Sequence, residues 1–360
     1  MDRNAIDINS NSGNRVLWLD MLRIIATVAV VVLHTAACQL WRTDLDSAQW
    51  SYLIFWDGLS RFGVPIFVMI SGALLLNVRG GVKSSVSYIH KNRIRRMITV
   101  FVFWSIVYTI ESYFHYNLNI YGVISAFIKG PTHLWYLFRI VGLYLALPLL
   151  QLIADSKYCK YFLRLCAIFS FAVPLLLWLA GLKSQTLSDI MSYPIDNLGL
   201  SIVGAFPFYF VFGYFLNNKM IGGKQKKIIY ILSAASFVLT VLLTIVFSRH
   251  DGVINDFFFG NATINVALEA IGVYVFFREK STKALAFEKY SSTIGRLSKY
   301  TFGVYLVHPL IISILDSIGI SAISGNALIL TPITAFVVLS ISFLISALLN
   351  RIPIIKNYIV

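Results

Sequence analysis

Residues 16–38 read VLWLDMLRIIATVAVVVLHTAAC, an apolar run interrupted by Asp20, Arg23 and His34. A helix of this length rises about 34 Å, which is enough to cross the ~30 Å hydrocarbon core of a bilayer. The polar segment 1–14, rich in Asn and Ser, precedes the run and is expected to be disordered. No small-residue cleavage site follows the run, so we interpret it as a transmembrane helix rather than a cleavable signal.

Similar runs recur along the whole chain, which is 58% hydrophobic and only 13% charged. Soluble proteins contain about 45–50% apolar and ~25% charged residues. The sequence therefore predicts an all-α, polytopic integral membrane protein with one membrane domain over residues 15–351. We expect the run at 62–77 to extend backward through Leu53–Leu59, and 120–128 to be an interfacial or re-entrant piece. About ten transmembrane helices are predicted, at 16–38, 62–77, 94–114, 133–153, 161–181, 198–217, 228–247, 257–277, 300–318 and 326–349.

The net charge of +14 reflects membrane topology rather than a nucleic-acid partner. With ten crossings, 23 of the 30 Lys and Arg residues lie in segments on one side and 5 on the other, while Arg23 and Arg139 lie within spans. Because basic residues are retained on the cytoplasmic side of a membrane, both termini are expected in the cytoplasm, including a tail at 352–360. Residues 37–60 are expected to form the longest external loop.

Two ionisable residues of the first predicted helix share one face. Arg23 and His34 are eleven residues apart, a rotation only ~20° beyond three full turns and a rise of about 16 Å. Asp20 lies one turn before Arg23 and can pair with it. Ionisable groups in hydrocarbon are costly, so each one is a functional hypothesis. The alternatives are an interfacial ion pair that fixes the helix depth, and a core histidine bonded to a neighbouring helix.

Three arginines outside the first helix are further candidates. Arg61 opens the motif RFGVPIF at the expected outer mouth, where a functional or pairing charge is favoured. Arg93 and Arg96 lie three residues apart where the third helix begins on the cytoplasmic side. Guanidinium groups bind phosphate in a bidentate fashion, so this pair suits a polyphosphate ligand. Anchoring of the helix by positive charge is the alternative for the pair.

Two more histidines lie in later spans: His133 opens the motif HLWYL, which includes Trp135, and His308 ends the motif YLVH, which begins at Tyr305. Single membrane histidines are often only helix-to-helix hydrogen bonds, but three of them indicate a shared polar cavity. The three cysteines form neither a disulfide framework nor a metal-ligand spacing, so no metal is expected. Several carboxylates could orient an imidazole, and the sequence does not choose among Asp20, Asp57, Glu111 and Asp316.

These motifs occur in a characteristic order. Arg23 with His34, the segment from Arg61 to Gly72, the pair Arg93 and Arg96, HLWYL and YLVH follow one another along the chain. Together they resemble the acyltransferase-3 family of membrane O-acyltransferases, from about Arg15 to Arg351. Within that family the chain is most similar to the branch that acetylates bacterial surface polysaccharides such as the enterobacterial common antigen. Each motif is weak alone, and five in order are specific.

The resemblance implies acyl transfer, most readily of acetyl, from a coenzyme A thioester to a sugar hydroxyl. It implies that His34 is a general base or, as a variant, a covalent acyl carrier. Arg23 would hold the pantetheine arm or polarise the carbonyl, and Arg93 and Arg96 would bind coenzyme phosphates. The residues expected to help bind or orient the acceptor are Arg61, His133, Trp135, Tyr305 and His308.

The resemblance also sets the expected ligands and location. Acetyl-coenzyme A is expected as a co-substrate, with no permanently bound cofactor, and a glycan or lipid-linked glycan is expected as acceptor. The other expected partner is membrane lipid, in the inner membrane of a bacterium. The runner-up, from a different functional class, is a transporter or flippase of a lipid-linked sugar, although no paired inverted repeat supports it.

Overall fold

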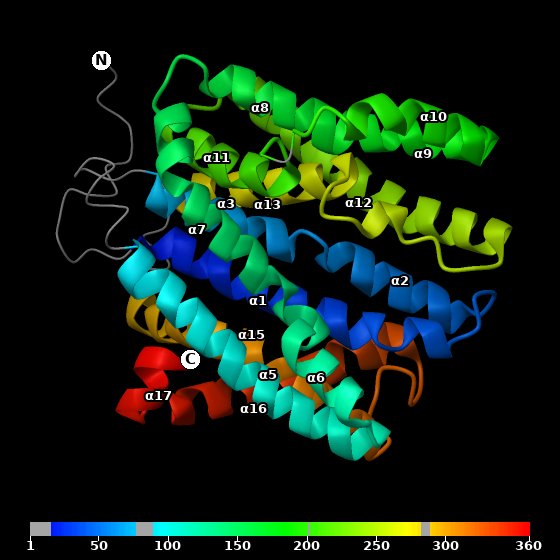
Figure 1. Cartoon of the computed structure of the whole chain (residues 1–360), viewed down its shortest axis with the longest axis vertical. Coiled ribbons are helices and arrows are strands. Elements are labelled where there is room, and N and C mark those ends of the chain that lie inside the picture. Colours follow the sequence, from blue (N-terminus) through cyan, green and yellow to red (C-terminus); the bar gives the residue numbers. More distant parts are fainter. Residues whose placement is uncertain (1–15, 77–88, 201, 282–288) are drawn as a thin grey trace.

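The computed structural model describes residues 16–76, 89–200, 202–281 and 289–360. The predicted disordered tail at 1–14 lies outside these residues. Within the described ranges the chain is helical and contains no β-strand, which confirms the all-α membrane fold (Figure 1). The elements in chain order are α1 (Leu17–Ala37), η1 (Leu40–Arg42), α2 (Ala48–Ser60), α3 (Gly63–Leu75), η2 (Ile89–Ile94), α5 (Arg95–Tyr116), α6 (Ile120–Lys129), η3 (Thr132–Leu134), α7 (Trp135–Ala154), α8 (Cys159–Ala167), η4 (Ile168–Ala172), α9 (Val173–Lys183), α10 (Gln185–Asp196), α11 (Ala205–Asn218), α12 (Gly223–Asp251), η5 (Phe257–Phe259), α13 (Ile264–Ser281), α15 (Ser291–Ser317), α16 (Ala327–Leu349) and α17 (Pro353–Tyr358).

Nine helical segments among the described residues are long and apolar enough to cross a membrane. The exception among the ten predicted spans is 198–217, where α11 has only 14 residues and begins after an extended Gly204. The element α10 packs beside α9 and α11 packs beside α8, at opposite ends of the molecule (Figure 1). The chain therefore runs back from one end of the bundle to the other through two short helices, α10 and α11, instead of one continuous span.

The predicted external loop at 37–60 is mostly helix, which corrects that expectation. Its second half forms α2, whose first turn is capped by Ser47, since the Oγ of Ser47 accepts a hydrogen bond of 3.1 Å from the Trp50 amide. The expected backward extension of the second span is confirmed and continues to Ala48, where the combined segment Ala48–Leu75 begins. The apolar run at 120–128 is a separate ten-residue helix, α6, that is too short to cross the membrane.

The helix α1 lies at the centre of the bundle and contacts α2, α3, α13, α15 and α16. The backbones of α3 and α11 approach each other closely. A Cβ atom added at Gly72 would lie 1.7 Å from the carbonyl oxygen of Phe210, and one added at Gly213 would lie 2.2 Å from that of Met69. Small residues permit this kind of crossing because they let the two backbones come close together. In a membrane, helix association depends on such close packing, since the hydrophobic effect does not drive helices together in lipid.

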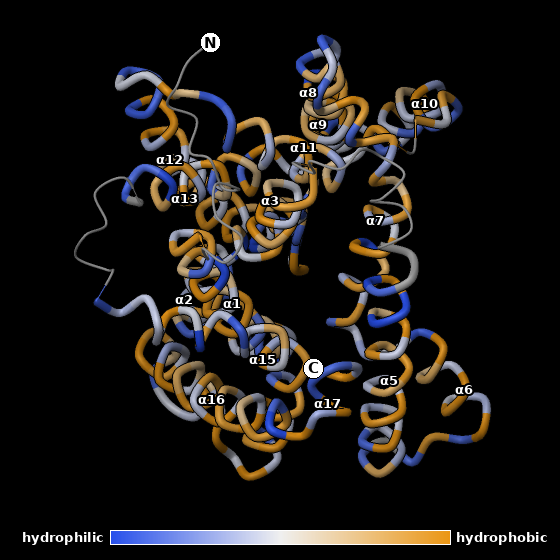
Figure 2. The backbone as a smooth tube through the Cα atoms, turned by 90° about the vertical axis from the view of Figure 1, so that its left-hand side faces the viewer, coloured by the Kyte–Doolittle hydropathy of each residue, from blue (hydrophilic) through white to orange (hydrophobic). Residues whose placement is uncertain are grey.

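The beginning of α1 and the final helix α17 lie at the same end of the bundle (Figure 1). Figure 2 views the molecule onto this end and shows apolar residues along the helices, with hydrophilic residues gathered where helices begin and end. The segment predicted as a tail at 352–360 packs against the domain, since Trp104 Nε1 donates to the carbonyl of Ile359 at 3.1 Å and Val360 is buried. Its cytoplasmic location stays a prediction.

Candidate active site

A cavity of about 190 Å³ lies between α1, α3, α5, α7 and α15. Arg23 and His34 both line it, so their predicted common face is the face that α1 turns toward the cavity. The cavity therefore runs along roughly 16 Å of α1. Its lining is mainly aromatic and apolar, with a few polar groups. The lining residues are Arg23, Val30, His34, Val64, Phe67, Ser71, Met97, His133, Trp135, Tyr136, Leu137, Ile140, Tyr144, Thr301, Phe302 and Tyr305.

The imidazole of His34 is held through its Nδ1 atom. Nδ1 lies 2.8 Å from the carbonyl oxygen of Val30 and 3.3 Å from Nε2 of His308. The carbonyl can only accept a hydrogen bond, so Nδ1 of a neutral His34 carries the proton. His308 in turn donates from its own Nδ1 to the Val304 carbonyl at 3.1 Å, which leaves its Nε2 as an acceptor. The Nε2 atom of His34 consequently has its lone pair free for chemistry.

Proline and tyrosine together shape the part of α15 that carries His308. Pro309 has no amide proton and breaks the hydrogen-bond ladder inside the helix. Next to this break, the hydroxyl of Tyr108 donates to the Leu306 carbonyl at 2.9 Å and accepts from the Leu310 amide at 3.2 Å. One buried hydroxyl from α5 thus replaces a helical hydrogen bond and ties α5 to the turn that positions His308.

His133 completes the group of three histidines. Its ring centroid is 5.8 Å from that of His308 and 5.6 Å from the ring of Tyr305. The Tyr305 hydroxyl donates to the backbone carbonyl of His133 at 2.8 Å, which fixes the start of α7 against α15. The Nε2 atom of His133 is buried and has no hydrogen-bond partner within the described residues. Two of the three histidines, His34 and His133, therefore lie on the wall of one mainly apolar cavity, and His308 lies directly behind His34.

At the other end of the cavity, Arg23 belongs to a small polar cluster. Its Nη1 lies 3.3 Å from Asp20 Oδ1 and 3.2 Å from Ser298 Oγ, and Ser298 donates to Asp20 at 2.5 Å. Asp20 is buried, whereas the Arg23 side chain keeps 31% of its exposure. The predicted pairing of Asp20 with Arg23 is confirmed, and the arginine still faces the cavity.

A second cavity, of about 570 Å³, adjoins the first. Met97 and Tyr144 line both cavities, so the two spaces meet at these side chains. The remaining lining is basic and polar and includes Arg93 and Arg96 of the predicted pair together with Arg95. Arg96 also donates to the backbone carbonyl of Val360 and lies over the ring of Phe302, which faces the first cavity.

The arrangement joins a basic pocket, suited to phosphate, to a narrow cavity that ends at an oriented imidazole. Such an arrangement can hold a phosphate group in the basic pocket and place another part of the same ligand beside the imidazole. A family model described as an acyltransferase domain matches residues 16–351, nearly the whole chain.

The chain belongs to the acyltransferase-3 family. No curated protein and no solved structure matches the chain. Membership makes the protein a membrane acyltransferase.

Not every candidate residue of this acyltransferase lies at the cavity. Arg61 forms an ion pair of 2.6 Å with buried Asp57, donates to the Phe259 carbonyl at 3.2 Å and stacks 4.0 Å above the Phe259 ring. It ties α2 to η5 and is not among the lining residues of the described cavities. Glu111 accepts a hydrogen bond from Ser313 at 2.8 Å, and Asp316 pairs with Arg42 at 2.5 Å.

In the acyltransferase, the groups that hydrogen-bond to His34 among the described residues are a carbonyl and a histidine, not one of the suggested carboxylates. Sequence reasoning missed several lining residues, notably Tyr136, Tyr144 and Met97. Tyr136 is part of the HLWYL motif and could have been included on that signal. Tyr144 and Met97 lie within ordinary apolar spans, where no local pattern distinguishes a cavity residue from a lipid-facing one.

Proposed function

We propose that this membrane acyltransferase is an O-acetyltransferase that moves an acetyl group from acetyl-coenzyme A to a sugar hydroxyl. The proposed acceptor is a bacterial surface polysaccharide or its lipid-linked precursor, and the proposed location is the inner membrane with both termini in the cytoplasm. The observation that carries this proposal is the oriented imidazole of His34 at the end of a cavity that adjoins an arginine-lined pocket.

In the proposed mechanism His34 acts as a general base. Its Nε2 removes the proton of the sugar hydroxyl as the oxygen attacks the thioester carbonyl carbon. The resulting tetrahedral intermediate collapses, the carbon–sulfur bond breaks, and the departing thiolate takes the proton back from the imidazolium. The products are an acetyl ester and free coenzyme A, and His34 is regenerated.

The second histidine supports the charged form of the base. While His34 holds the proton, its Nδ1–H continues to donate to the Val30 carbonyl and to Nε2 of His308. Both acceptors stabilise positive charge on the ring, as the orienting acid does in other acyl-transfer enzymes. His308 is therefore a positioning residue in this proposal, and the free Nε2 of His133 is a candidate to bind the acceptor hydroxyls.

The donor enters through the arginine-lined pocket in this proposal. Arg93 and Arg96 bind the coenzyme phosphates, and the pantetheine arm passes between Met97 and Tyr144 into the first cavity. Arg23, held by Asp20 and Ser298, lies along that route. The ring faces of Trp135, Tyr136 and Tyr305 offer a surface on which a sugar can lie. The small volume of the cavity favours acetyl over longer acyl groups.

A complementation experiment tests the proposal. A strain that lacks the gene is complemented with the wild type, His34→Ala or His250→Ala. The acetyl content of its surface glycans is then measured by mass spectrometry. His250 is an exposed histidine at the end of α12, so its variant is a matched control. Loss of a general base typically lowers the rate by ~10²–10⁴, so His34→Ala is expected to abolish the acetyl mass at normal protein abundance, while His250→Ala retains it.

Two outcomes would contradict the proposal. A stable His34→Ala protein that acetylates glycan at a near wild-type rate would remove the base. A deletion strain that loses the whole glycan from its surface, with the acetyl content of intracellular precursor unchanged, would instead support a transporter.

A further inference from the structure

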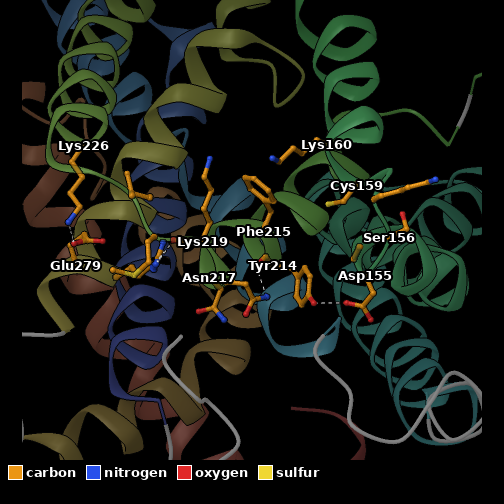
Figure 3. A pocket seen from close by; sticks show the side chains of 16 residues that line it. Asp155, Ser156, Cys159, Lys160, Tyr214, Phe215, Asn217, Lys219, Lys226 and Glu279 are labelled. Atoms are coloured by element: carbon orange, nitrogen blue, oxygen red, sulfur yellow. Dashed lines mark hydrogen bonds and ion pairs between the residues drawn. The ribbon is translucent and has the colours of Figure 1, made fainter. Parts of the chain in front are cut away.

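A second wall of basic residues surrounds a separate cavity of about 1010 Å³ at the end of the bundle where α8 and α12 begin. Its walls come from the α7–α8 connection, the end of α11, the start of α12 and the end of α13 (Figure 3). None of its lining residues lines the His34 cavity or the pocket of Arg93 and Arg96. The volume matches that of cavities that bind small molecules, which span about 300–1,000 Å³.

The charge in this cavity is predominantly positive. Five basic side chains line it against two acidic ones, and both acids are already engaged. Asp155 accepts a hydrogen bond of 2.6 Å from the Tyr214 hydroxyl, and Glu279 pairs with Lys226. Figure 3 shows these two contacts on opposite sides of the cavity. The positive charges that no carboxylate neutralises within the described part of the chain are those of Lys157, Lys160 and Lys219.

Buried contacts hold one of these lysines in place. The buried guanidinium of Arg278 donates to the carbonyls of Leu216 and Lys219, which satisfies acceptors left open at the end of α11. The ammonium of Lys219 then lies 5.2 Å from the centroid of the Phe215 ring. An ammonium over an aromatic face keeps donors available for an anion. From the opposite wall, Lys160 at the start of α8 extends toward the same space (Figure 3).

An unsatisfied buried amide gives an observation independent of the charges. Asn217 lines the cavity with only 3% of its surface exposed. Neither its amide nitrogen nor its amide oxygen has a hydrogen-bond partner within the described residues. Because buried polar groups are nearly always paired, an orphaned amide beside a basic cavity indicates a missing ligand that can accept a hydrogen bond.

We infer that this cavity is a binding site for a phosphate-bearing anion, separate from the acyl-transfer site. Lys160 and Lys219 supply the charge, and the Asn217 amide donates a hydrogen bond to a phosphate oxygen. Charge-assisted hydrogen bonds to phosphate are roughly twice as strong as neutral ones, so two lysines and an amide suffice for a specific site. The phosphate belongs either to the headgroup of an anionic phospholipid or to a soluble compound such as a nucleotide.

The test uses the full-length protein in lipid nanodiscs and two probes. Phosphatidylglycerol retention is measured by native mass spectrometry from discs that mix it with phosphatidylcholine, and adenosine diphosphate binding is measured by equilibrium dialysis. The variants are Lys160→Gln with Lys219→Gln, and separately Asn217→Leu, which removes the amide without removing any hydrogen bond seen in the described structure. The matched control is Lys224→Gln with Lys227→Gln, which neutralises two exposed lysines at the start of α12 outside the cavity.

Wild-type protein is expected to bind one of the two probes saturably, and the probe that binds identifies the source of the phosphate. Both site variants should weaken that binding by at least about tenfold, the loss expected when charged hydrogen bonds are removed, while the control variant stays within about twofold. Failure of both probes to bind, an equal loss in the control, or unchanged binding in Asn217→Leu would overturn the inference. No acyl transfer enters the readout, so the result is independent of the proposed reaction.

Discussion

At the scale of single residues, the spacing of Arg23 and His34 was enough to place both side chains on one face, since helical geometry fixes that relation. The partner that orients His34 could not be predicted in the same way. His308 lies 274 residues away in sequence, and only the packing of α15 against α1 brings the rings to a centroid distance of 4.9 Å. Chemistry alone favoured a carboxylate as the group that orients His34, but in the structure the acceptor is the imidazole of His308.

The positioning role of His308 predicts a graded response to substitution. His308→Ala should lower kcat by about tenfold, which is less than the loss for His34→Ala, because the Val30 carbonyl still holds Nδ1 of His34. His308→Gln retains an acceptor and should recover part of the loss, with KM unchanged in both variants.

The double variant His34→Ala with His308→Ala provides the control for this role. If His308 acts only through His34, the double variant is no slower than His34→Ala alone, since the second change then has nothing to orient. A further drop in kcat in the double variant, or a rise in KM without any change in kcat, would assign His308 to substrate binding instead.

At the scale of helices, hydropathy predicted the positions of the spans but not the break within one of them. The run 198–217 has the composition of a continuous helix, yet Gly199 has a φ of 61° and Gly204 is extended, so α11 starts late. Likewise, the polar residues of 37–60 suggested a loop, while the packing of Trp50, Leu53 and Ile54 in the core makes α2 helical. Local composition indicates whether a segment lies in an apolar or a polar environment. Tertiary contacts determine where its helices begin and end.

The crossing of α3 and α11 predicts an asymmetric effect of adding one methyl group. Gly72→Ala or Gly213→Ala forces a Cβ into the backbone of the facing helix, so each should destabilise the fold by about 1–3 kcal/mol or more. Gly142→Ala, in the middle of α7, is the matched control, because no atom lies within 4 Å of the added Cβ. Its better helix propensity should leave stability equal or slightly raised.

The measurement is the thermal unfolding midpoint of each purified variant in the same detergent. A midpoint for Gly72→Ala equal to that of Gly142→Ala would show that α3 and α11 do not depend on this close contact.

At the scale of the whole molecule, the sorting of basic residues and the structure agree on which segments lie at the same end. The start of α1, the start of α12 and the final helix α17 lie together (Figure 1), as an even number of crossings requires. The paired short helices α10 and α11 preserve that parity. The direction of insertion rests on charge alone, since a helix bundle has no intrinsic inside or outside.

This topology predicts a labelling pattern. In a protein whose native cysteines are replaced, Asp46→Cys should react in intact cells with a thiol reagent that cannot cross the inner membrane, since Asp46 is highly exposed in the connection between η1 and α2. Lys227→Cys, exposed at the other end of the bundle, should react only after the membrane is permeabilised. Labelling with these two positions exchanged would invert the orientation and move the arginine-lined pocket to the outside.

The two side chains shared by the arginine-lined pocket and the His34 cavity have a consequence for the host cell. Any gap between Met97 and Tyr144 that admits a coenzyme arm also admits water and hydronium, so the permeability barrier cannot rest on them. Each 100 mV of membrane potential drives a proton with about 2.3 kcal/mol. We expect a leak to be stopped farther along by a buried apolar cluster, whose members Leu134 and Val307 are next in sequence to His133 and His308. In that case the cluster keeps the energy of the ion gradient from draining through the enzyme.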